Sequence, residues 1–139
     1  MNLVELLESL SPGDIVAVIG SPARTCYADL DDLWAVLSTL HSLQVIPCHA
    51  HRAPFDMHLE SLCLSSGFHA CNVGPDEPGI APYERIECVE RLLHPDVKAL
   101  LVFHAQGRPV EETDPDVCAY AESVGIPIVP VPRMHVKEK

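Results

Sequence analysis

The sequence lacks the features of a membrane-spanning or exported protein. No apolar run approaches the roughly 18 residues that a transmembrane helix needs. The first residues, MNLVELLESLSPGD, are acidic and amphipathic. They have neither the basic start nor the small-residue cleavage site of a signal peptide. We therefore expect a cytoplasmic protein that makes no contact with a membrane.

Basic residues are also scarce. Nine Lys and Arg stand against 20 Asp and Glu, which gives a formal net charge of -11. A surface that follows the phosphates of a nucleic acid needs clustered Lys and Arg, so we expect no nucleic-acid partner. One or two arginines can still bind a single anionic ligand. An acidic surface also suits a basic protein partner.

The sequence has no CxxC motif. Its six cysteines are spread evenly along the chain, at positions 26, 48, 63, 71, 88 and 118. A chain of 139 residues can bury a core without disulfide bonds. We therefore expect these cysteines to be small buried side chains.

What the sequence does contain is an alternation of β-branched apolar runs and helical patterns. Strands are predicted at 15–20, 44–48, 68–73, 97–103 and 126–131, and helices at 4–10, 29–43, 54–67, 83–94 and 114–125. Such alternation indicates βαβ units and a parallel sheet. We predict one Rossmann-like α/β domain over residues 1–139, with three layers and about five mainly parallel strands between two helical faces. Residues 1–13 would form an N-terminal helical segment and 132–139 a mobile tail.

Two segments carry more specific expectations. Pro127 and Pro130 place the last strand at a sheet edge, because proline cannot donate to the ladder. The 29–43 helix has an apolar face that is expected to pack on the sheet and comprises Leu30, Leu33, Trp34, Leu37 and Leu40. Its aspartates at 29, 31 and 32 are expected to cap its first turn.

In this architecture ligands bind beyond the carboxyl ends of the strands, at the topological switch point. That rule selects four loops, at 20–27, 48–56, 74–85 and 104–114. His104 and Gln106 directly follow a predicted strand, where functional side chains gather in such folds. His49 and His51 lie in the second loop and could donate a hydrogen bond or stack on a base.

The order of these loops resembles a known family. The first strand ends in IGSPAR, the second leads into AHRAPFD, YERIECV precedes the fourth strand, and SVGIPIV closes the chain. In this order the chain resembles a divergent member of the SLOG superfamily. The nearest branch is the stand-alone YpsA/YspA-like group of bacterial and phage proteins, related to DprA/Smf and LOG proteins. The matching positions are Gly20, Ser21, Arg24, Arg52, Asp56, Arg85, Gly107 and Thr113.

The resemblance implies binding of a nucleotide or nucleotide-derived small molecule, including NAD derivatives. The residues expected to contact it are Gly20, Ser21, Arg24, His49, His51, Arg52, Asp56, Arg85, His104, Gln106, Gly107 and Thr113. If a reaction occurs, the family suggests hydrolysis of a nucleotide N-glycosidic or phosphate bond, with Glu111 or Glu112 as the acid/base candidate. The family's glycine-rich second turn is absent, since Ala53 and Pro54 stand there.

The stretch CHAHRAPFD, residues 48–56, keeps several interpretations open. Cys48, His49 and His51 could ligate a metal, although no second cluster accompanies them. A cysteine activated by a histidine is another option. Two further interpretations carry equal weight: a ligand-binding turn in which Arg52 pairs with an anion at a helix N-terminus, and a solvated loop whose histidines have no function.

A different class of function also stays open. The missing glycines could mark a degenerate pocket, in which case the domain would be an acidic module that docks onto a protein. A homodimer is compatible with either interpretation.

Overall fold

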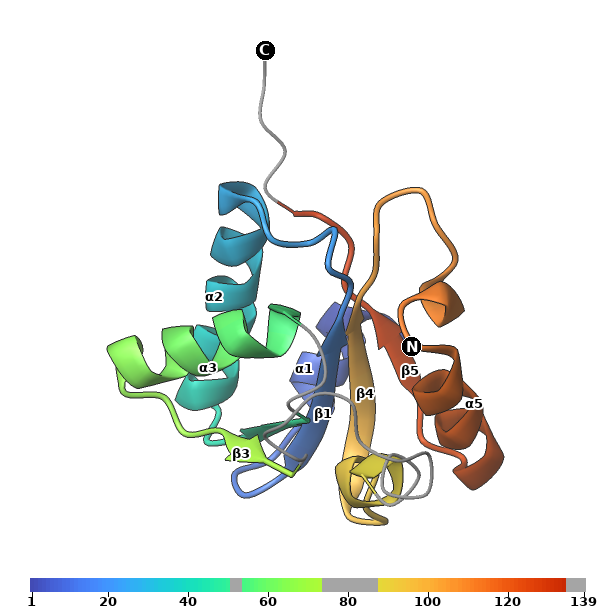
Figure 1. Ribbon diagram of the computed structural model, residues 1–139. Helices are drawn as coiled ribbons and strands as arrows, with labels where there is room; N and C mark the ends of the chain where they lie inside the picture. The colour runs from blue at the N-terminus through green and yellow to red at the C-terminus, as the bar shows by residue number, and fades with distance from the viewer. Residues whose placement is uncertain (51–53, 74–87, 135–139) are drawn as a thin grey trace.

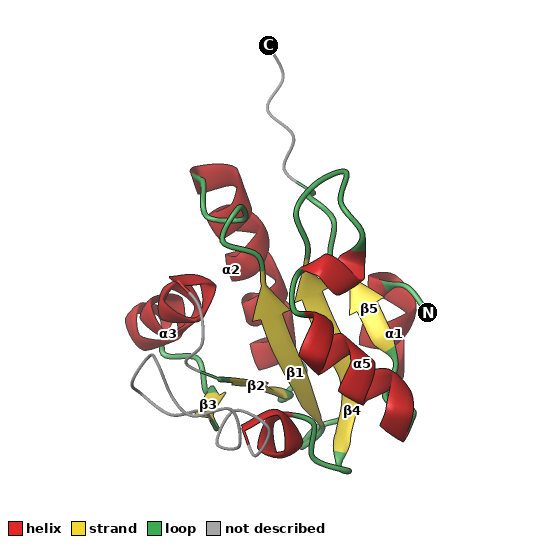
Figure 2. Cartoon of the chain, turned by 45° about the vertical axis from the view of Figure 1, so that its right-hand side comes forward, coloured by secondary structure: helices red, strands yellow, loops and turns green. Residues whose placement is uncertain are grey.

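The computed structural model describes residues 1–50, 54–73 and 88–134 of the chain. Within them, a five-stranded parallel sheet has the order β3-β2-β1-β4-β5 (Figure 2). Its strands are β1 (Ile15–Gly20), β2 (Ile46–His49), β3 (Cys71–Asn72), β4 (Val97–Phe103) and β5 (Ile128–Pro130). This arrangement confirms the predicted Rossmann-like α/β fold.

Helices cover both faces of the sheet. Their bounds are α1 (Leu3–Ser9), α2 (Tyr27–Ser42), α3 (Pro54–Ser66) and α5 (Pro115–Val124), with a short 3-10 helix at Val110–Glu112. Residues 88–92 are helical too. Helices α2 and α3 lie on one side of the sheet and α5 on the other (Figure 1). Among the described helices, none is long and apolar enough to cross a bilayer.

The two faces of β1 build two separate core layers. Val16 and Val18 pack with the apolar faces of α1, α2 and α3. Ala17 and Ile19 point the other way, against α5 and the 88–92 helix. Each of these four side chains is at most 7% exposed. A strand buried on both faces explains why 15–20 is apolar at every position.

The helix and edge signals in the sequence are confirmed at α5 and β5. The Asp114 side chain accepts a hydrogen bond from the Val117 N–H and caps the start of α5. Gly125 ends the helix with φ +77°, a left-handed conformation that glycine adopts without a steric penalty. Strand β5, which carries Pro130, is the edge strand that the prolines predicted.

Three local expectations differ from the structure. The strand predicted over 68–73 shrinks to two exposed residues at the other sheet edge. The polar loop after β4 contains the unpredicted 3-10 helix. Trp34 was expected in the core but is 47% exposed; its ring lies beside that of Phe68, with 6.3 Å between the ring centroids.

Candidate functional site

The switch point of this sheet lies between β1 and β4, where the strand order reverses. Its floor is the pair Gly20 and Phe103, the last residues of the two strands. Phe55, from the first turn of α3, packs directly over Gly20 and leaves no room there for a Cβ atom. The rings of Phe55 and Phe103 are 5.1 Å apart and at most 1% exposed. Protein side chains therefore occupy the space directly above β1.

Arg24, a predicted ligand contact, is buried and bound within the protein. Its Nε donates to Asp29 at 2.7 Å, and its Nη2 lies 3.4 Å from Asp32. Its Nη1 donates to the carbonyl oxygens of His104 and Val131, at 3.0 and 2.7 Å. The guanidinium therefore ties the loop after β1 to the ends of β4 and β5.

The segment after β5 joins the same network. Arg133 donates through Nε and Nη2 to the two carboxylate oxygens of Asp29, at 2.9 and 2.8 Å. The Met134 N–H donates to Asp32 at 2.9 Å. The first residues of the predicted tail, which begins at residue 132, thus make hydrogen bonds to α2. Residues 135–139 lie outside the described part of the chain.

Asp29 and Asp32 lie in the first two turns of α2, and both accept hydrogen bonds from the Arg24 guanidinium. Burial would raise the pKa of Asp29, but hydrogen bonds from Arg133, Cys26 and Arg24, with the charge of Arg24, outweigh it. The pKa of Asp29 falls from 3.8 to about 2. The carboxylate is thus held in its charged form by the cations around it.

Acidification is expected to remove about 2 kcal/mol of stability through Asp29. A carboxyl whose folded pKa is depressed stabilises the fold fully above its unfolded value of 3.8. That contribution is lost as the pH falls from there toward about 2. Urea unfolding at a series of pH values would measure the slope, which Asp29→Asn should flatten. The exposed neighbour Asp31, changed to Asn, should leave it intact. An unchanged slope in Asp29→Asn would contradict the assignment.

Ser21, another predicted contact, shapes the turn that delivers Arg24. Its N–H donates to the Phe103 carbonyl at 2.9 Å, which extends the β1–β4 pairing by one bond. Its carbonyl accepts from the Arg24 N–H at 2.9 Å, and its hydroxyl accepts from the Ala23 N–H at 3.1 Å. The hydrogen bonds of Ser21 therefore stabilise the turn between β1 and Arg24.

The predicted contacts after β4 separate in space. His104 is half-buried, with Nδ1 3.1 Å from the Ala105 carbonyl oxygen, and stays beside Arg24. Gln106 and Gly107 are exposed further along the loop, and Gly107 has φ +76°. The turn requires a left-handed backbone conformation at position 107, which glycine adopts without a steric penalty.

Glu111 and Glu112, the acid/base candidates, are exposed in the 3-10 helix. Glu112 pairs with Arg108 at 2.8 Å on the surface. Thr113 precedes the α5 cap, and among the described residues its buried Oγ1 has no hydrogen-bond partner.

A cavity of about 420 Å³ opens instead at the carboxyl ends of β2 and β3. His49 is the last residue of β2 and Asn72 the last of β3, and the two are paired in register. The wall opposite comes from α3 and the turn after it. The lining comprises His49, Glu60, Cys63, Leu64, Gly67, Phe68, His69, Ala70 and Asn72. The volume is of the size that small-molecule ligands occupy.

His49 is the buried polar group of this cavity. It is 1% exposed, and its Nε2 lies 3.7 Å from Glu60 and its Nδ1 3.7 Å from Asp56. Within the described chain, Nδ1 has no hydrogen-bond partner. Asp56 and Glu60 reach the imidazole together because residues four apart share one face of a helix. Of the predicted residues, the structure thus brings His49 and Asp56 together.

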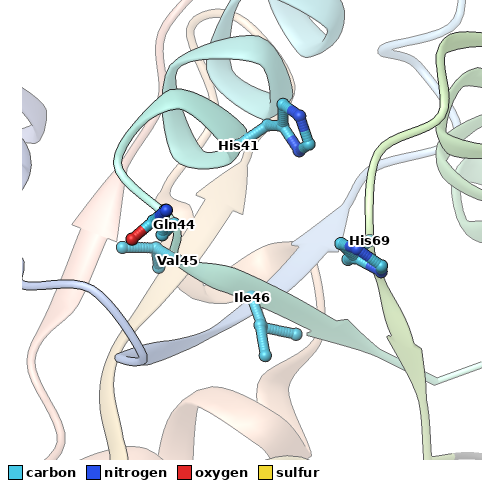
Figure 3. A pocket seen from close by; sticks show the side chains of 5 residues that line it. All are labelled: His41, Gln44, Val45, Ile46 and His69. Carbon is cyan, nitrogen blue, oxygen red and sulfur yellow. The ribbon is translucent and has the colours of Figure 1, made fainter.

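A second hollow of about 500 Å³ adjoins this cavity and shares His69 with it. His41 of α2 and His69 stand over Ile46 in this hollow (Figure 3), with 6.4 Å between their ring centroids. The Phe68 ring lies 4.9 Å from that of His41. Aromatic faces therefore flank the opening on the α2 side.

Several predictions concern residues that the structure does not describe. His51 and Arg52 lie outside the described residues, as does the whole 74–85 loop with Arg85. Of the proposed metal ligands, Cys48 and His49 point to opposite faces of β2. In the described ranges, no group of three or more His, Cys, Asp or Glu residues is placed to hold a metal ion.

The sequence analysis missed the residues that complete the cavity. Asn72 donates to Glu60 at 2.7 Å, across the gap between β3 and α3. The rule that ligands bind beyond the carboxyl ends of strands, here called the strand-end rule, would have selected Asn72. The spacing of four residues from Asp56 would have selected Glu60. Phe68 and His69 carry no such signal, since their position depends on how the turn after α3 folds.

Comparison with known proteins returns no relative: no family model, no curated protein and no solved structure matches the chain. The SLOG resemblance therefore stays a prediction from the sequence.

Proposed function

We propose that this protein binds a nucleotide or nucleotide-derived small molecule in the cavity at the carboxyl ends of β2 and β3. The observation that carries the proposal is His49, which lines that cavity between two carboxylates and whose Nδ1 has no hydrogen-bond partner among the described residues. A buried polar atom without a partner costs free energy unless something pairs with it. A bound ligand or an ordered water would supply the missing hydrogen bond.

The other lining residues suit the base of such a ligand. The edge of a nucleotide base carries ring nitrogens and exocyclic amines, which need both hydrogen-bond donors and acceptors. Glu60 accepts hydrogen bonds, and Asn72 both donates and accepts them. Phe68 and His69 offer ring faces for stacking. The strand direction supports the location, because the cavity lies beyond the carboxyl ends of β2 and β3, the side on which Rossmann-like sheets bind ligands.

A thermal-shift screen tests this proposal. Purified protein would be heated with nucleosides, nucleotides, cyclic nucleotides, NAD derivatives and ADP-ribose compounds. One ligand class, at about 100 times its Kd, is expected to add about 2.7 kcal/mol of stability and raise the unfolding midpoint by several degrees. Glu60→Gln should abolish that shift, whereas Glu122→Gln, on the exposed side of α5, should keep it.

The remaining outcomes decide against the proposal. If no ligand class shifts the midpoint, the cavity does not bind nucleotides, and the protein-docking alternative becomes the better hypothesis. If EDTA alone lowers the midpoint, the CHAHRAPFD stretch holds a metal. A shift that survives Glu60→Gln would place the ligand elsewhere on the protein.

A further inference from the structure

Strands β2 and β3 place two cysteines directly opposite each other. Cys48 and Cys71 are register partners in this parallel pair. Neighbouring strands are about 4.7–4.9 Å apart, which lies inside the range of about 4.4–6.8 Å that a disulfide spans between Cα atoms. Register partners in a sheet point to the same face, so the two thiols face each other on the side opposite His49 and Asn72.

The two thiols differ in access to solvent. Cys48 is 6% exposed, whereas Cys71 is exposed. Burial first, then the charge of Cys71 and a hydrogen bond with it, raise the pKa of Cys48 to about 12. Cys48 is therefore a protonated thiol near neutral pH, and Cys71 is the sulfur that a dissolved oxidant reaches.

We propose that Cys48 and Cys71 form a reversible disulfide that fastens β3 to β2 when the protein meets a peroxide. The Cys71 sulfur attacks one peroxide oxygen, the O–O bond breaks, and a sulfenic acid and one water form. The Cys48 sulfur then displaces the hydroxyl of that sulfenic acid, and its proton leaves with the hydroxyl as a second water. Two electrons pass from the two sulfurs to the peroxide, and a dithiol reverses the reaction.

The position of the bond predicts its physical effect. Strand β3 is two residues long and lies at the sheet edge. A 48–71 disulfide closes a loop that contains all of α3, so it restricts the unfolded chain and stabilises the fold. The pair immediately precedes His49 and Asn72, so the bond also fixes the two strand ends that line the cavity. This inference does not depend on which ligand the cavity binds.

Mass spectrometry of the wild-type protein tests the inference. The protein is treated with hydrogen peroxide at a one-to-one ratio, alkylated, and digested without reductant. We expect a cross-linked peptide pair that fragmentation assigns to Cys48 and Cys71, and two fewer titratable thiols among the six. The unfolding midpoint should rise on oxidation and return with dithiothreitol.

Matched variants separate this pair from general cysteine oxidation. Cys71→Ser should abolish the cross-link and the rise in midpoint, and so should Cys48→Ala. Cys26→Ser removes the other exposed cysteine and should leave both intact. A sulfenic or sulfinic acid on Cys71 without a cross-link would overturn the inference. So would a cross-link to a different cysteine, or a pair that stays reduced while Cys26 is oxidised.

Discussion

Arg24→Ala is expected to lower the free energy of unfolding by about 3–5 kcal/mol, as removal of one partner from a buried ion pair does. The side chains of Arg24, Asp29 and Asp32 are at most 1% exposed in these pairs. The substitution leaves two buried carboxylates without this cation, and it removes donors from the carbonyl oxygens of His104 and Val131. Urea unfolding near neutral pH measures the loss.

The matched control is Arg108→Ala. Arg108 also pairs with a carboxylate at 2.8 Å, but its side chain is 65% exposed. Exposed pairs of this kind contribute about 0.3–0.5 kcal/mol, so the control should unfold almost as the wild type does. Similar small losses in both variants would show that water solvates the Arg24 network. Arg24→Lys should keep part of the stability, since it retains the charge but not the planar donors.

Sequence patterns predicted the framework of this fold because they report what each segment buries. The run at 15–20 is apolar throughout, since β1 is covered on both faces. The α5 boundaries follow from Asp114 and Gly125, whose effects act within a few residues. Local signals of this kind need no knowledge of the tertiary structure.

The Arg24 network could not be predicted in the same way. In this network Asp29 binds both Arg24 and Arg133, and Arg133 follows Asp29 by 104 positions in the sequence. Aspartates at the start of a helix are expected to cap it, and an arginine after β1 is expected to meet a ligand. Only the tertiary structure, in which the residues after β5 meet the start of α2, brings these charges together.

The candidate site also has a part that local signals predict and a part that depends on the tertiary structure. The strand-end rule, which depends on strand direction alone, selected His49, and His49 lines a cavity. The same rule also selected the switch point, where Phe55 fills the space over Gly20. Whether a loop leaves a crevice open depends on side chains from distant elements, and a single sequence does not show them.

Gly20→Ala is expected to lower the free energy of unfolding by about 3 kcal/mol, at the upper end of the cost of overpacking a core. Gly20 has no positive φ, so the cost is steric and not conformational. An added Cβ would overlap the Phe55 ring, which is 1% exposed and packed against Phe103. Because the Phe55 ring is surrounded by other protein atoms, it cannot move aside into solvent to make room for the added methyl group. Urea unfolding of the purified variant measures the change.

The Phe55→Ala background supplies the control for Gly20→Ala. Removing the ring is itself expected to cost about 3–5 kcal/mol. In that background, however, Gly20→Ala should cost less than about 1 kcal/mol, because the added methyl enters the space that the ring has left. An equal cost in both backgrounds would show that Phe55 does not define the steric limit at Gly20. The predicted coupling would instead identify Phe55 as the side chain that closes the switch point, where a Rossmann-like sheet otherwise presents its glycine to a ligand.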